Sequence, residues 1–141
     1  MSTEHRLVSK GQRWLMALAL GVVVLGGVIA AQLGAAGSAQ TFQNVSVEDL
    51  AAASGHLVDV REPWEYARGH VPGAQLIPLG ELEARASELP ENMPIYLICQ
   101  TGNRSLRASD ILLAAGVKDV RNVLGGTQAW TEAGYPVERN E

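Results

Sequence analysis

The chain has 141 residues, of which 47% are hydrophobic and 18% are charged, a composition typical of one globular domain with an appendage and not of a disordered chain. Its single cysteine excludes an intrachain disulfide framework and a zinc site built from several thiolates. From residue 40 onward, eight basic residues face 14 acidic ones, a net charge of −6. No nucleic-acid partner is expected, because that function normally needs a basic face.

The N-terminal part of the chain predicts membrane targeting. A basic N-terminus, residues 1–13, precedes an uncharged apolar stretch, residues 14–36, and a small-residue linker follows at 37–40. No Lys or Arg follows the apolar stretch until Arg61, so the positive-inside rule places the N-terminus in the cytoplasm. We expect a single-pass anchor in the cell membrane with the domain on the extracytoplasmic (periplasmic) side. The alternative is a signal peptide cleaved near Ala39, which would leave a soluble periplasmic protein.

Strand and helix patterns alternate about five times over the remaining domain, residues 41–139. In chain order, the sequence predicts a strand at 41–45, a helix at 46–54, a strand at 56–60, a helix at 62–69, a strand at 74–79, a helix at 81–89, a strand at 94–99, a helix at 105–115, a strand at 118–123 and a helix at 125–134. This alternation indicates an α/β fold with a mainly parallel sheet and helices on both faces. Such sheets bind ligands beyond the carboxyl ends of their strands.

Cys99 lies at that edge, where the apolar run "IYLI" stops and a glycine-containing loop leads into a helix. The loop amides and the first turn of the helix favour a negative charge, and Arg104 adds a permanent cation. Gly102 permits a backbone conformation that a side chain would obstruct. We therefore expect a thiolate with a lowered pKa beside an anion site, in place of a structural cysteine buried as a small apolar side chain.

Three blocks of the sequence resemble the single-domain rhodanese family of sulfurtransferases. They are "CQTGNRS", the upstream "LVDVREPWEYARGHVPGAQLIPL" and the downstream "VLGGTQAW" with "GYPV", so that the resemblance spans about residues 41–138. It implies a five-stranded parallel sheet, with Cys99 as nucleophile and persulfide carrier. The six-residue active-site loop would consist of Cys99 with Gln100, Thr101, Gly102, Asn103 and Arg104.

The resemblance also implies an activity. A sulfane sulfur would move from thiosulfate or a similar small anionic donor, through the Cys99 persulfide, to cyanide or to an external thiol. That thiol would belong to a small molecule or to a thioredoxin-like protein. No metal and no organic cofactor are expected. Two alternatives remain: a phosphatase or arsenate-type enzyme, whose related domains use a loop one residue longer, and a non-catalytic module that binds sulfur or a partner.

Other polar residues could support the site. Asp59 and Arg61 end a strand at the same sheet edge, and they either brace the site or form a structural ion pair that also caps the next helix. Ser105 and Arg107 begin the helix after the loop, and Arg107 either lines the mouth of the pocket or is solvated. His70 is expected to hydrogen-bond within a turn, with a proton shuttle as the alternative.

Overall fold

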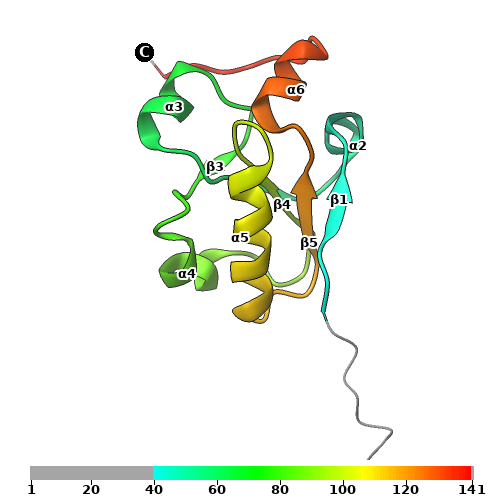
Figure 1. Cartoon of the computed structure of the whole chain (residues 1–141), viewed down its shortest axis with the longest axis vertical. Helices are drawn as coiled ribbons and strands as arrows, with labels where there is room; N and C mark the ends of the chain where they lie inside the picture. The colour runs from blue at the N-terminus through cyan, green and yellow to red at the C-terminus, as the bar shows by residue number, and fades with distance from the viewer. Residues whose placement is uncertain (1–39, 141) are drawn as a thin grey trace, which may run out of the picture. The chain divides into compact units, whose positions relative to one another are not determined.

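Five parallel strands form one sheet in the computed structural model, which describes residues 40–140. The strand order is β1-β5-β4-β2-β3, and every neighbouring pair is parallel (Figure 1). The strands are β1 (Gln43–Val45), β2 (His56–Asp59), β3 (Gln75–Leu76), β4 (Ile95–Ile98) and β5 (Val120–Val123). The predicted fold class is therefore confirmed for this part of the chain. The predicted anchor at 14–36 and its basic flank lie outside the described residues.

All helices but the last connect successive strands, the last follows the final strand, and all of them fall near their predicted positions. They are α2 (Val47–Ala52), α3 (Pro63–Arg68), α4 (Leu82–Arg85) with the 3₁₀ turn η1 (Ala86–Glu88), α5 (Asn103–Ala114) and α6 (Gly126–Glu132). Helix α5 begins two residues earlier than expected, because its N-cap is Gly102 with a left-handed backbone (φ 101°). The last two loop residues, Asn103 and Arg104, thus belong to the first helical turn.

Helices cover both faces of the sheet, as the residues of β4 show. Alternate strand side chains point to opposite faces, and all four residues of β4 are buried. Ile95 and Leu97 pack with Leu112 of α5 and Leu82 of α4 in one core cluster. The residues between them, Tyr96 and Ile98, belong to a second cluster with Leu50 of α2 and Trp130 of α6. A strand buried on both faces reads as a continuous apolar run, which explains "IYLI".

The segments that follow β2, β4 and β5 meet at one edge of the sheet. In Figure 1, β5 points toward α6, and the loop that precedes α5 lies at the same end of the molecule.

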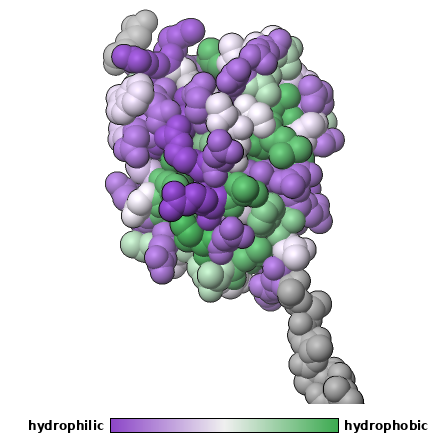
Figure 2. Space-filling view, viewed as in Figure 1, coloured by the Kyte–Doolittle hydropathy of each residue, from purple (hydrophilic) through white to green (hydrophobic). Residues whose placement is uncertain are grey.

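Figure 2, viewed from the same side, shows hydrophilic residues over much of the face that carries α5, with smaller hydrophobic areas between them. Among residues 40–140, no helix is both long and apolar enough to cross a bilayer.

Candidate active site around Cys99

Cys99 directly follows β4, and its thiol is enclosed by the start of α5. The Cys99 residue is 1% exposed. Its Sγ accepts a hydrogen bond from the Gly102 backbone N–H at 3.1 Å and lies 3.5 Å from the Ser105 hydroxyl oxygen. Gly102 can turn its N–H toward the sulfur because it adopts a positive φ of 101°. The structure thus brings Cys99, Gly102 and Ser105 together.

These contacts favour the thiolate. Burial raises the pKa of the Cys99 thiol, but hydrogen bonds from Ser105 and from the backbone amides of Gly102 and Thr101 outweigh it, so that the pKa lies below its ordinary value. This direction agrees with the expectation from the sequence. A lowered pKa increases the share of the nucleophilic thiolate at neutral pH.

The Ser105 hydroxyl has one proton and two possible acceptors. It lies 3.1 Å from the carbonyl oxygen of Gly102, to which it can donate, as well as 3.5 Å from Sγ. When Cys99 is a thiol, the S–H can donate to Ser105 while Ser105 donates to Gly102. When Cys99 is a thiolate, the sulfur needs the hydroxyl proton. Ionisation of Cys99 is therefore coupled to the orientation of this hydroxyl.

Backbone N–H groups at the N-terminus of α6 donate hydrogen bonds to the Cys99 loop. The backbone N–H of Thr127 donates to the carbonyl oxygen of Cys99 at 2.8 Å, and that of Gln128 donates to the carbonyl oxygen of Gln100 at 3.1 Å. A methyl group on Gly126 would collide with the carbonyl oxygen of Cys99, so only glycine allows this approach. The sequence showed the glycine pair here but not its contact with the loop.

Arg61 forms hydrogen bonds both to the loop and to groups outside it. It is buried, pairs with the buried carboxylate of Asp59 at 2.7 Å and donates to the carbonyl oxygen of Gly69 at 2.9 Å. It also lies 3.3 Å from the side-chain oxygen of Gln100, which accepts a second hydrogen bond from Thr127 Oγ1 at 3.1 Å. Asp59 and Arg61 thus form a structural ion pair that also braces the loop.

The predicted cap on the next helix is not made by Asp59 or Arg61. The N-cap residue of α3 is Glu62, whose backbone N–H donates to the carboxylate of Glu65 at 3.0 Å.

Arg104 is paired with a carboxylate, a partner that the sequence analysis did not identify. Its two terminal nitrogens donate to the two carboxylate oxygens of Glu65, at 2.6 and 2.7 Å. The hydrogen bond from Arg104 lowers the pKa of Glu65 to about 2, so this carboxylate is charged at neutral pH. Glu65 lies 39 residues from Arg104 in the chain, on α3, and the sequence interpretation missed it.

The remaining candidate residues lie farther from the sulfur or face solvent. Thr101, Asn103 and Arg107 are exposed. His70 is buried, stacks on the Tyr66 ring and donates from Nδ1 to the carbonyl oxygen of Tyr66 at 2.9 Å. This agrees with the expected structural hydrogen bond. Among residues 40–140, no cluster of His, Cys, Asp or Glu could hold a metal ion.

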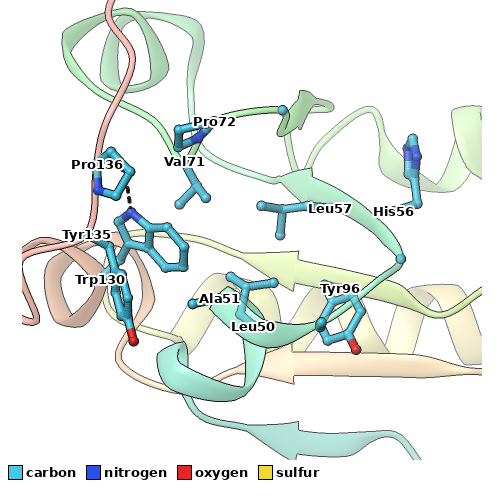
Figure 3. Close-up of a pocket in the computed structure, with 13 residues that line it drawn as sticks. Leu50, Ala51, His56, Leu57, Val71, Pro72, Tyr96, Trp130, Tyr135 and Pro136 are labelled. Atoms are coloured by element: carbon cyan, nitrogen blue, oxygen red, sulfur yellow. Dashed lines mark hydrogen bonds between the residues drawn. The ribbon is translucent and has the colours of Figure 1, made fainter.

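Two hollows of the surface differ in their relation to the site: one adjoins the Cys99 loop and the other does not. One, of about 650 Å³, adjoins the loop and is lined by residues that include Arg61, Trp64, Glu65, Arg68, Gln100 and Arg139. The other, of about 510 Å³, contains no residue of the Cys99–Arg104 loop. Figure 3 shows its walls, formed by side chains such as Leu50, Leu57 and Tyr96, and by Trp130, whose indole N–H donates to the carbonyl oxygen of Pro136 at 2.8 Å. The first hollow is the one adjacent to the thiol loop.

The comparisons with known proteins agree on one family. The sequence model described as "Rhodanese-like domain" matches residues 43–133. The putative sulfur carrier protein YrkF of Bacillus subtilis is 49% identical over 76 residues, which are 54% of this chain and 41% of that protein. A protein named sulfurtransferase from Allochromatium vinosum is 37% identical over 81 residues, which are 57% of this chain and 76% of that one.

Solved structures agree with the observed fold. The crystal structure of a rhodanese-related protein from Thermoplasma volcanium superposes with a TM-score of 0.61 at 34% identity. The match covers 70% of this chain and 99% of that one. The matched part of this chain is therefore about the size of that whole domain, whereas this chain spans less than half the length of YrkF.

Proposed function

We propose that this chain, which belongs to the rhodanese-like domain family, is a sulfurtransferase that carries sulfane sulfur as a persulfide on Cys99. The observation that carries the proposal is the environment of the sulfur, which is buried, faces the Gly102 amide and the Ser105 hydroxyl, and has a lowered pKa. Relatives named as sulfurtransferases support the same activity.

The proposed transfer step makes use of this geometry. The Cys99 thiolate attacks the outer sulfur of the donor, forming an S–S bond to Sγ and breaking the donor's own S–S bond. With thiosulfate the leaving group is sulfite, so that three negative charges stand on each side of the equation and no oxidant is needed. The loop amides then face the terminal sulfur of the persulfide, which carries the negative charge.

The acceptor has to come from outside this chain, because Cys99 is its only cysteine. A thiolate of a small molecule or of a thioredoxin-like protein attacks the terminal sulfur and takes it, returning Cys99 as a thiolate. Cyanide removes the same sulfur as thiocyanate. No metal or organic cofactor takes part in these steps.

Intact mass measurement tests the proposal. Incubation with thiosulfate should add the mass of one sulfur atom, with one sulfite released per protein, and Cys99→Ser should show neither change. Added cyanide or a small thiol should reverse the mass change. Hydrolysis of aryl phosphates without modification by thiosulfate would instead support the phosphatase alternative.

A sulfur carrier and a turnover enzyme share this persulfide, and the name of the YrkF relative raises the carrier role. Steady-state kinetics separates the two. An enzyme releases thiocyanate over many cycles with thiosulfate and cyanide present. A carrier loaded by a partner protein shows one stoichiometric transfer and then stops.

For the cellular location we propose the periplasmic side of the cell membrane, on the basis of the charge pattern in residues 1–36. Protease added to cells with an opened outer barrier should digest the domain while a cytoplasmic marker stays intact. Protection equal to that of the marker would contradict the proposal. N-terminal sequencing separates an anchor from a signal peptide, since cleavage leaves a start near Gln40.

A further inference from the structure

Arg61, which contacts the Cys99 loop, and Arg104, which belongs to it, are both paired with carboxylates. Arg61 is matched by Asp59, and Arg104 by Glu65, in both cases within 2.7 Å. An anion that reaches the loop therefore meets two neutral ion pairs. At the loop itself, the favourable groups left for it are backbone amides and the N-terminal end of α5, which carry partial charges. The full charges of Arg68 and Arg139 belong to the wall of the adjoining hollow.

The Arg104–Glu65 pair is built to persist. It is bidentate, Glu65 also accepts the N-cap amide of α3, and its side chain is 12% exposed against 33% for Arg104. A bidentate pair with charge-assisted hydrogen bonds resists replacement by a weakly held anion. Thiosulfate would have to compete with Glu65 for the same guanidinium.

The hollow beside the loop offers room for more than a small inorganic ion. Its volume is about 650 Å³, and its wall includes Glu65 and Gln100 together with Trp64, a residue that is 61% exposed. The guanidinium of Arg68 lies over that indole, 5.1 Å from the ring centroid. An aromatic surface of this kind suits the organic part of a ligand.

We propose that Glu65 is a specificity-determining residue: by holding Arg104 in an ion pair, it suits the Cys99 loop to singly charged organic sulfane-sulfur donors and disfavours the doubly charged thiosulfate ion. The donor class comprises organic thiosulfonates and organic persulfides. This inference rests on the proposed persulfide chemistry and identifies the kind of donor that the same site accepts. Glu65 acts through Arg104 and contacts no reacting atom.

The transfer balances for this class as it does for thiosulfate. A thiosulfonate anion, R–SO₂–S⁻, gives its outer sulfur to the Cys99 thiolate and leaves as a sulfinate, R–SO₂⁻. An organic persulfide gives its outer sulfur in the same way and leaves as a thiolate. In each case one S–S bond breaks, one forms, and no external oxidant or reductant takes part.

Two donors isolate the effect of charge. Thiosulfate and benzenethiosulfonate present the same reacting S–S bond, but the first carries two negative charges and the second one. For each, kcat/KM is measured with cyanide as acceptor, and the readout is the ratio of the benzenethiosulfonate value to the thiosulfate value. Arg68 and Arg139 attract both donors, so a change in this ratio reports on the loop.

Glu65→Gln frees the charge of Arg104 while an amide oxygen can still accept the N-cap hydrogen bond of α3. We expect the ratio to fall about threefold to tenfold, mainly through a lower KM for thiosulfate, as for one extra unit charge near a half-exposed site. Arg104→Gln should raise the ratio, because it leaves Glu65 unpaired. The double variant should return the ratio to within about twofold of the wild type, since it restores neutrality.

Glu88→Gln is the matched control. Glu88 also forms a bidentate pair with an arginine, Arg85, and the change in formal charge is the same. In Figure 1 the segment that carries this pair, around α4, lies at the end of the molecule away from the Cys99 loop. This variant should leave the ratio unchanged, which separates a local effect of Glu65 from a change in net charge.

The outcomes distinguish this inference from the proposed function. If wild-type protein forms no persulfide with either donor, both fail. If persulfide forms but Glu65→Gln and Arg104→Gln leave the ratio unchanged, or shift it in the same direction, the inference fails while the sulfurtransferase proposal stands. Should Glu65→Gln fail to fold, the shift in Arg104→Gln and its reversal in the double variant decide the question.

Discussion

The Cys99 loop has a buried side and a partly exposed side, and the two are held in different ways. On the buried side, the loop is held by backbone amides of α6 and by Arg61, which lies between β2 and α3. On the exposed side, one ion pair between Arg104 and Glu65 of α3 borders a hollow and remains partly exposed. Both sides use hydrogen bonds of similar length, yet their surroundings differ.

The buried side therefore determines the shape of the loop, and the exposed side determines the charge beside it. Buried contacts with exact partners set where the loop amides point, so changing them should alter folding and the rate of every donor alike. A half-exposed ion pair contributes little to stability, but it sets the charge that an approaching ion meets. Variants on the buried side should therefore act on stability and kcat, and variants on the exposed side on KM.

The largest effect is expected on the buried side, from Arg61→Met. This change leaves the carboxylate of Asp59 buried without its partner, which should lower the free energy of unfolding by about 3–5 kcal/mol. Gln100 also loses one of its two side-chain partners, so persulfide formation should slow with every donor. Urea denaturation and stopped-flow transfer rates measure the two effects.

The double variant with Asp59→Asn separates charge burial from loop support. It removes the unpaired charge, so more than half of the lost stability should return. Transfer should remain slow, because Gln100 still lacks Arg61. Full recovery of the rate in the double variant would show that Arg61 does not position the loop.

Gly126→Ala should have the next largest effect. Its added methyl group meets the carbonyl oxygen of Cys99, and its φ of 59° also disfavours a side chain. We expect a loss of about 2–4 kcal/mol in the free energy of unfolding, together with slower transfer. Gly134→Ala is the control: it has a similar φ of 81° but open space around it, so that a loss of about 1 kcal/mol and no change in transfer rate should follow. Equal effects from the two variants would contradict a close approach at Gly126.

The features that the sequence predicted depend on short-range patterns. The buried run before Cys99 and the glycine three residues after the cysteine lie within one element and its loop, and each strand and helix of the alternation shows its own local pattern. The positive φ of Gly102 follows from such a local requirement, and the structure shows it. The position of Cys99 at the carboxyl edge follows from the parallel sheet.

The missed features depend on contacts between distant segments. Glu65 reads locally as a helix residue three positions after an N-cap, and nothing near it indicates an arginine 39 residues away. Thr127 likewise lies 27 residues from Gln100. Both contacts arise because the sheet order places β2, β4 and β5 side by side, so that the segments following them meet. That order requires the three-dimensional pairing of strands, which a single sequence does not show.

The smallest expected effect concerns the thiol itself and tests whether the loop tunes charge from its buried side as well. Ser105→Ala removes the hydroxyl that lies 3.5 Å from Sγ, while Gly102 keeps its amide hydrogen bond. The pKa of Cys99 should rise, and its alkylation by iodoacetamide at pH 7 should slow about twofold to tenfold, as for the loss of one hydrogen bond. Ser109→Ala is the control, because this equally buried serine of α5 donates to the carbonyl oxygen of Ser105 and not to the sulfur.

Stability against pH gives an independent measurement of the same contact. A thiol whose pKa is lower in the folded protein than in the unfolded chain stabilises the fold above the unfolded-chain pKa, and this contribution disappears as the pH falls through the folded-state value. Ser105→Ala should lose part of that contribution. The difference in urea midpoint between wild type and Ser105→Ala should therefore widen as the pH rises through the window between the two pKa values, whereas the difference for Ser109→Ala should stay constant. If the difference in urea midpoint for Ser105→Ala narrowed with rising pH, Ser105 would stabilise the protonated thiol. The hydroxyl would then donate to Gly102 whether Cys99 is a thiol or a thiolate, and it would only accept a hydrogen bond from the Cys99 thiol.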